Sequence, residues 1–429
     1  MVENFNDRTV AAKFMTLVVV LAPMFLQYTI FFPFLLFPEF FLVLFSAYFL
    51  LVNRRVDFFY SAVVFSFYVY LLSITIIYYY SYGYLDLFLS IGTSARFLLY
   101  LFVVVVLYRN FNRDLGARLL VYLAIFNSLY GLAQYISYNF FGITLPWYFS
   151  FLNIQYGSRL INEQEDIFSE FGFRFSGLFS EPAHFSQYVG FALLVVNFYK
   201  PSLVFSRRFA IFSTLLFVFV LLLSSSGTAF ILVLFFMLVF FYRNIFVRFS
   251  YLKFVKILLL SIFVFLLFFT TSIDGFFSGL DRILRFGESS TVYVRVVRPI
   301  DVFLNIDIMR KIFGVGYGNF SVYLDSIGGF NDYEQSLGFA WTNSLGVMLV
   351  GAGLVGTAFI VFFYLRVFLK SDAFGRIVVL FILIHFFFSD LPHNMFFVSF
   401  ILFALSHESR SKETLECSAQ FSRTNLKMA

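Results

Sequence analysis

Charged residues and cysteine are both scarce in this sequence. Only 13% of the 429 residues are charged, whereas 61% are hydrophobic. A soluble protein of this length could not bury so much apolar surface, so the composition excludes a soluble globular fold. The single cysteine, Cys417, lies in a polar C-terminal tail. An intramolecular disulfide is therefore excluded, and the external loops must be ordered by packing.

The sequence also lacks the common motifs of metal and nucleotide chemistry. His, Cys and acidic residues nowhere have metal-ligand spacing, and neither Asp-x-Asp nor Gly-x-Ser-x-Gly occurs. We therefore expect no metal and no other cofactor. The glycine-rich segment 314–320 (GVGYGNF) matches a dinucleotide-binding fingerprint only in part and does not follow a strand. It predicts a tight loop that allows close backbone approach to a ligand or to a helix end.

Long apolar stretches are present instead, and they predict an all-α polytopic membrane protein. A membrane-crossing helix needs about 20 apolar residues, and continuous apolar runs do not fit the alternating pattern of a β-barrel. We predict about twelve transmembrane helices. Their expected positions are 14–32, 34–52, 58–80, 90–108, 119–141, 183–199, 209–224, 227–242, 256–272, 340–365, 376–389 and 395–406.

Basic residues fall in alternate loops of this predicted bundle. The loop at 109–118 is basic, for example, whereas the neighbouring loop at 81–90 has no Lys or Arg. Because basic loops stay in the cytoplasm, we expect both termini and the tail 407–429 to be cytoplasmic. Two long loops, 142–181 and 272–340, would then lie on the outer side. We find no internal repeat and no linker, which predicts a single integral membrane domain.

Ionisable residues gather in the two outer loops, whereas the predicted spans hold few, chiefly His385 and Arg96. A transporter or channel would place such groups within its spans. Their position favours an activity at the membrane–water interface, with a substrate that has a polar head and an apolar tail. The loop arginines suit phosphate because the guanidinium fork binds two oxygens at once. The arginines that we expect to bind substrate are Arg159, Arg285, Arg295 and Arg298. The alternative is that they pair with local acids, as Arg298 could with Asp301.

The segment 174–188 (RFSGLFSEPAHFSQY) joins the first long loop to an apolar run. Glu181 followed by Pro182 predicts a helix start, where proline is tolerated and a carboxylate meets the positive end of the helix dipole. His184 is three residues further on and shares a helical face with Glu181. Glu181 is the candidate general base and His184 the second candidate. The alternative for Glu181 is structural, an ion pair with Arg174.

Three segments in this order resemble the O-antigen polymerases (Wzy type) of the O-antigen ligase/polymerase superfamily, and they span most of residues 119–365. The first, RFSGLFSEPAHFSQY, is similar to the family's Arg–Gly–Phe–Glu/Asp–Pro segment after its first large periplasmic loop. The second, LLLSSSGTAFILVL at 221–234, is similar to two tightly joined spans with a Ser/Thr-rich turn. The third is Arg295, then GVGYGNF, then TNSLGVMLVGAGLVG at 342–356, similar to the family's arginine, glycine-rich loop, asparagine and glycine-rich span.

The resemblance implies a GT-C-like glycosyltransferase in the bacterial inner membrane. Such enzymes join oligosaccharide repeat units carried on undecaprenyl pyrophosphate, on the periplasmic face and without a metal. Arg174, Glu181 and Arg295 occupy the motif positions and are the expected catalytic residues. Asn343 is expected to bind substrate. His184 matches no fixed position of the family, and we expect it to bind substrate because it lies beside Glu181. The implied partners are the lipid-linked oligosaccharide, membrane lipid and a chain-length regulator protein, and no nucleic acid.

Three alternatives remain, of which the last, a structural membrane scaffold, is disfavoured by the two long charged loops. The first is ligase activity, which transfers glycan to lipid A core and for which the superfamily carries a histidine in the second large loop. This chain has no histidine between His184 and His385, which favours the polymerase. The second is a flippase or exporter of lipid-linked sugars, which would need a polar path that the predicted spans do not offer.

Overall fold

The chain is an α-helical membrane protein. The computed structural model describes residues 3–31, 35–53, 57–82, 86–154, 173–199, 204–224, 226–242, 297–330, 335, 340, 342–389 and 394–406, and most of these are helical. Four described helical stretches are long and apolar enough to cross a membrane, and several shorter apolar helices accompany them. The four are Phe58–Tyr80, Leu87–Leu107, Arg113–Phe141 and Ser344–Lys370.

Most predicted spans coincide with helices, but the first is placed wrongly. Helix α1 runs from Glu3 to Leu21 and continues as the 3₁₀ turn η1, Ala22–Phe25. The backbone is already extended at Thr29, where strand β1 (Thr29–Phe31) begins. This strand pairs antiparallel with β2 (Leu35–Leu36). Pro23 explains the early end, because its ring cannot continue a regular helix. The predicted span 256–272 lies outside the described residues.

Contacts along the chain divide it into two compact units. Unit 1 comprises Met1–Pro23, Pro38–Arg113 and Gly287–Ala429, and unit 2 comprises Met24–Phe37 and Asp114–Phe286. Each unit combines segments that are distant in sequence, so the division does not follow a simple boundary between domains. The expectation of a single membrane domain stays a prediction.

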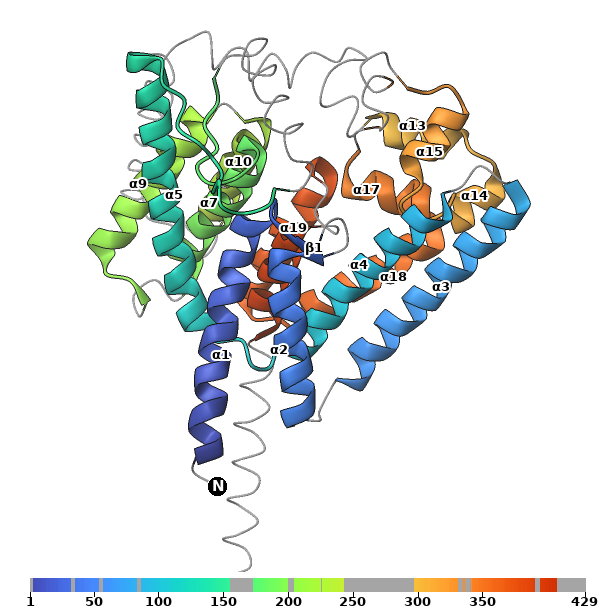
Figure 1. Cartoon of the computed structure of the whole chain (residues 1–429), viewed down its shortest axis with the longest axis horizontal. Coiled ribbons are helices and arrows are strands. Elements are labelled where there is room, and N and C mark those ends of the chain that lie inside the picture. Colours follow the sequence, from blue (N-terminus) through green and yellow to red (C-terminus); the bar gives the residue numbers. More distant parts are fainter. Residues whose placement is uncertain are drawn as a thin grey trace, which may run out of the picture. The chain divides into compact units, whose positions relative to one another are not determined.

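Unit 1 is built around the helix 395–406, which is buried along its whole length. Ser399 Oγ donates to the Val19 carbonyl of α1 at 2.7 Å, and Ser371 Oγ donates to the Ala404 carbonyl at 3.1 Å. The helices packed in this unit are α1, α2 (Phe37–Asn53), α3 (Phe58–Tyr82), α4 (Leu87–Leu107), α13 (Arg298–Asn305), α14 (Ile308–Phe313), α15 (Phe320–Ser326), α17 (Ser344–Gly346), α18 (Gly353–Lys370) and α19 (Ala373–Phe388). Among them, α3, α4 and α18 lie side by side (Figure 1).

The predicted span 340–365 contains a helix that is interrupted between Val347 and Gly353. After α17 the chain forms a π-helical stretch, Val347–Ala352, and Gly353 then takes a positive φ of 68° before α18 starts. A side chain at Gly353 would collide with the backbone of residues 312–314, so only glycine fits there. The interruption frees backbone carbonyls inside an otherwise apolar helix.

The glycine-rich loop 314–320 satisfies these carbonyls. The Val315 N–H donates to the Val350 carbonyl at 2.8 Å, and the Gly316 N–H donates to the Gly351 carbonyl at 3.0 Å. The Tyr70 hydroxyl of α3 donates to the Ala352 carbonyl at 2.7 Å. The predicted tight loop is therefore confirmed, and the close backbone approach is to a helix interruption.

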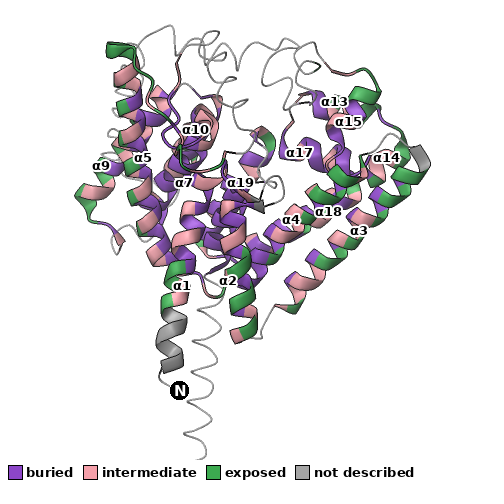
Figure 2. Ribbon diagram, viewed as in Figure 1, coloured by how far each residue is buried: buried purple, intermediate pink, exposed green. Residues whose placement is uncertain are grey.

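Unit 2 packs around α7, Pro182–Phe198, which is buried over most of its length (Figure 2). Its neighbours are α9 (Arg207–Leu223) and α10 (Gly227–Phe241), and a side chain at Gly190 would overlap Leu232 of α10. Between α9 and α10 the chain turns within a few small residues, as the serine-rich motif predicts. The fourth long element of this unit is α5, Arg113–Phe141.

Candidate functional site

The turn before α7 is held by amide side chains of α5. Gln134 forms two hydrogen bonds with Gly177, donating to its carbonyl at 3.0 Å and accepting from its N–H at 2.9 Å. Asn127 Oδ1 accepts from the Leu178 N–H at 3.2 Å. Gly177 has a φ of 62°, a conformation that favours glycine. The segment that carries Arg174 and Glu181 is therefore fixed against a membrane helix by polar contacts that motif reasoning alone did not reveal.

Glu181 lies at the start of α7, as predicted. It is the N-cap residue with extended backbone, and Pro182 is the first helical residue. Its side chain does not cap the helix, and within the described residues its carboxylate forms no hydrogen bond or ion pair. The expected structural alternative, an ion pair with Arg174, is not formed. A half-buried carboxylate at a helix N-terminus is thus left available to a ligand.

Two polar side chains follow Glu181 along α7. His184 is half-buried, one helical turn further on. Gln187 is 2% exposed, and its Oε1 atom has no hydrogen-bond partner among the described residues. A buried carbonyl oxygen without a partner is costly, so such atoms in native structures commonly bind water or a ligand. Gln187 was not predicted, because a lone glutamine in an apolar helix carries no motif.

Arg298 and Asn343 belong to unit 1. Arg298 is the first residue of α13 and is 8% exposed, whereas Asp301 is exposed and does not pair with it. Asn343 is 1% exposed, and both the oxygen and the nitrogen of its side-chain amide form hydrogen bonds. Its Oδ1 accepts from the Gly346 N–H at 2.7 Å, and its Nδ2 donates to the Phe387 carbonyl at 2.5 Å. These contacts tie the interrupted helix to α19, and a substrate role for Asn343 stays a prediction.

Unit 1 contains a further ionic cluster, of which the sequence analysis identified only one member. Glu39, in the first turn of α2, is 1% exposed and forms an ion pair with Arg96 Nε of α4 at 3.0 Å. The Tyr100 hydroxyl, one turn beyond Arg96, donates to Glu39 Oε1 at 2.7 Å. Arg96 was noted as an ionisable residue within a predicted span. Its partner was not found, because the two residues are far apart in sequence and belong to no shared motif.

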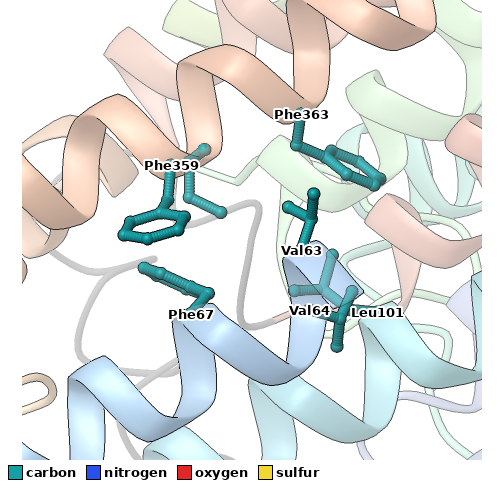
Figure 3. A pocket seen from close by; sticks show the side chains of 7 residues that line it. Val63, Val64, Phe67, Leu101, Phe359 and Phe363 are labelled. Atoms are coloured by element: carbon teal, nitrogen blue, oxygen red, sulfur yellow. The ribbon is translucent and has the colours of Figure 1, made fainter. Parts of the chain in front are cut away.

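A small pocket of unit 1 is unsuited to a polar ligand. Figure 3 shows it between α3, α4 and α18, with the rings of Phe67 and Phe359 on either side. Val63, Leu101 and Phe363 complete a wholly apolar lining. Among the described residues there is also no group of three or more His, Cys, Asp or Glu side chains that could hold a metal ion.

Three of the predicted site residues, Arg159, Arg285 and Arg295, lie outside the described residues. Arg174, Glu181 and His184 come from one short segment of unit 2, and Arg298 and Asn343 come from unit 1. Comparison of the chain with protein-family models gave no match, and comparison with curated proteins gave none either. The functional interpretation therefore depends on the residues themselves and on the resemblance of their motifs.

Proposed function

We propose that the protein is a glycosyltransferase that joins lipid-linked oligosaccharide repeat units into a surface polysaccharide. In this proposal the donor and the acceptor are both carried on undecaprenyl pyrophosphate, and the reaction takes place at the periplasmic face of a bacterial inner membrane. The observation that carries the proposal is the half-buried Glu181 carboxylate, free of ionic partners in the described part of the chain, at the entrance of the buried helix α7.

Glycosyl transfer from a pyrophosphate requires a general base and fixed cations. Glu181 takes the proton of the acceptor hydroxyl while that oxygen forms a bond to the anomeric carbon of the donor sugar. The bond from this carbon to the pyrophosphate oxygen breaks, and undecaprenyl pyrophosphate leaves with the electron pair. Arginine is suited to stabilise the departing charge, since its fork binds phosphate oxygens and it stays protonated. We assign this role to Arg295, with support from Arg298 and Arg174.

The surroundings of Glu181 support its role as a base. The turn that precedes it is fixed by Gln134 and Asn127, so the carboxylate starts from a defined backbone position. To His184, one turn along α7, we assign the orientation of the acceptor hydroxyl. The absence of a histidine between His184 and His385 favours polymerase over ligase activity.

The test is the glycan profile of a strain in which variants replace the native protein. Glu181→Gln and Arg295→Ala should insert into the membrane at normal levels but give single-unit lipid-linked glycan and no ladder of chain lengths. Glu163→Gln and Lys311→Ala, which remove charges from the same two predicted loops, should keep the ladder. Arg295→Lys should recover only part of the polymer, because lysine lacks the fork.

Three results would count against the proposal. If Glu181→Gln and Arg295→Ala both keep the full ladder, the assignment of these residues is wrong. If deletion of the protein leaves polymer intact but removes its attachment to lipid A core, the activity is that of a ligase. If deletion leaves the lipid-linked units facing the cytoplasm, the protein is a transporter.

A further inference from the structure

The ion pair between Glu39 and Arg96 uses only one nitrogen of the guanidinium. Arg96 Nε faces Glu39 Oε1 at 3.0 Å, whereas Nη1 and Nη2 form no hydrogen bond or ion pair with any described residue. The carboxylate is 1% exposed and the Arg96 side chain is 32% exposed. One edge of the guanidinium is therefore fixed within the protein, and the other edge is presented outward.

The helix surface beside Arg96 is open. A long side chain in a helix leans over the preceding turn, which for position 96 is the turn containing Gly92. A side chain added at Gly92 would meet nothing within 4 Å, and Ala95 is small and exposed. The outward edge of the guanidinium thus has room for a ligand.

Exposed apolar side chains flank this open surface. On the two preceding turns of α4, Phe88 is 88% exposed and Leu89 is 44% exposed. Because α4 is long and apolar enough to cross a membrane, these side chains are suited to acyl chains. An arginine with two outward N–H groups, next to apolar side chains, fits a molecule with a phosphate head and a hydrocarbon tail.

We infer that Arg96, oriented by Glu39, binds the phosphate group of a membrane lipid on the outer surface of α4. The ligand is either an ordinary anionic phospholipid or a polyprenyl phosphate, which share the phosphate and differ in the tail. Glu39 and Tyr100 act as positioning residues: Glu39 pairs with the guanidinium, Tyr100 donates a hydrogen bond to Glu39, and neither contacts the phosphate. The inference concerns binding alone, and it is independent of the proposed polymerase activity.

The test must separate loss of binding from loss of folding. Arg96→Gln alone leaves the buried Glu39 carboxylate without its cation, which is destabilising. The double variant Glu39→Gln/Arg96→Gln removes both charges with side chains of similar shape, so it keeps the buried site neutral. Arg109→Gln is the matched control, since it removes the same charge from the other end of α4, where Arg109 is 3.7 Å from Asp57.

Binding is measured by native mass spectrometry of the purified full-length protein, titrated with phosphatidylglycerol and, separately, with undecaprenyl phosphate. The double variant should unfold near the wild-type temperature and bind at least one probe about tenfold or more weakly, as expected for lost charge-assisted hydrogen bonds. Arg109→Gln should bind like the wild type. Weaker binding of both probes indicates a general phospholipid site, and weaker binding of undecaprenyl phosphate alone indicates selection by the tail. Wild-type affinity of the folded double variant for both probes would overturn the inference.

Discussion

Gly177 is the residue on which the turn before α7 depends most directly. Its φ is 62°, and an added side chain would lie 3.1 Å from the Phe185 ring and 3.2 Å from Asn127. Gly142 has a similar φ of 67° but open space around it. The two glycines therefore share the same backbone requirement and differ in packing.

Alanine at these two positions should separate strain from crowding. Gly142→Ala should cost about 1 kcal/mol through the left-handed conformation alone. Gly177→Ala should cost about 2–3 kcal/mol, because Asn127 and Phe185 must also move. The measurement is the unfolding temperature of the purified protein in detergent. Equal losses for the two variants would show that the contacts around Gly177 contribute nothing.

Glu181 and Glu39 differ in how far the sequence could predict their roles. Glu181 stands next to Pro182, so local rules of helix initiation were enough to place it. Glu39 also follows a proline, Pro38, but its importance comes from Arg96 and Tyr100, which reach it only in the folded chain. A residue whose role depends on a distant partner cannot be assigned from spacing alone.

The interrupted helix was not predictable for a different reason. Residues 340–365 are continuously apolar, and glycine is common in membrane helices. Nothing in such a run shows whether Gly353 continues the helix or ends it. The outcome is decided by the loop 314–320, whose N–H groups bind Val350 and Gly351. Helix 395–406 is the opposite case, since a short apolar segment proves to be the most enclosed element of unit 1.

Tyr70 gives a direct test of how much the interruption depends on side-chain support. Its hydroxyl donates to the Ala352 carbonyl, and Tyr68 on the same helix has no such contact within the described residues. Tyr70→Phe should lower the free energy of unfolding by about 1 kcal/mol, the usual net value of a hydrogen bond. Tyr68→Phe should change it little. Equal effects in reversible unfolding from mixed micelles would mean that Tyr70 does not stabilise the interruption.

Arg113 and Asp372 join distant parts of the whole chain. The two guanidinium nitrogens Nη1 and Nη2 face the two carboxylate oxygens at 2.9 and 3.0 Å, and Arg113 is 5% exposed. Asp372 also caps α19 by accepting from the Gly375 N–H at 2.8 Å. The pair thus connects, within unit 1, the end of the segment Pro38–Arg113 to the start of α19.

Removal of this arginine should be far more costly than removal of a surface one. Arg113→Ala should cost about 2–3 kcal/mol, somewhat below a fully buried pair because Asp372 is 27% exposed. Arg109→Ala should cost about 0–1 kcal/mol, since the Arg109 side chain is 36% exposed and lies 3.7 Å from Asp57. Unfolding of both variants in mixed micelles gives the comparison. A loss as small for Arg113 as for Arg109 would show that the connection is not stabilising.

The side of the membrane on which each loop lies is a prediction about the whole molecule, and it can be tested with few variants. Asp325 lies in the second long loop and Lys370 ends α18, and both are exposed. Among the described residues between them, the interrupted helix 344–370 is long and apolar enough to cross, so the two positions report whether it crosses the membrane. Helix α18 alone has 18 residues, about 27 Å long, close to the hydrocarbon thickness of about 30 Å. The interruption therefore leaves enough helix to cross.

Single cysteines make the comparison possible, because Cys417 is the only native one. In a Cys417→Ser background, Asp325→Cys should react with a membrane-impermeant maleimide in spheroplasts. Lys370→Cys, and Cys417 in the native chain, should react only after permeabilisation, since the basic loops are expected in the cytoplasm. Reaction of Asp325→Cys and Lys370→Cys from the same side would mean that the chain turns back at Gly353. The glycine-rich loop would then line a re-entrant segment. The predicted number of spans would fall by one, so the two termini would no longer lie on the same side of the membrane.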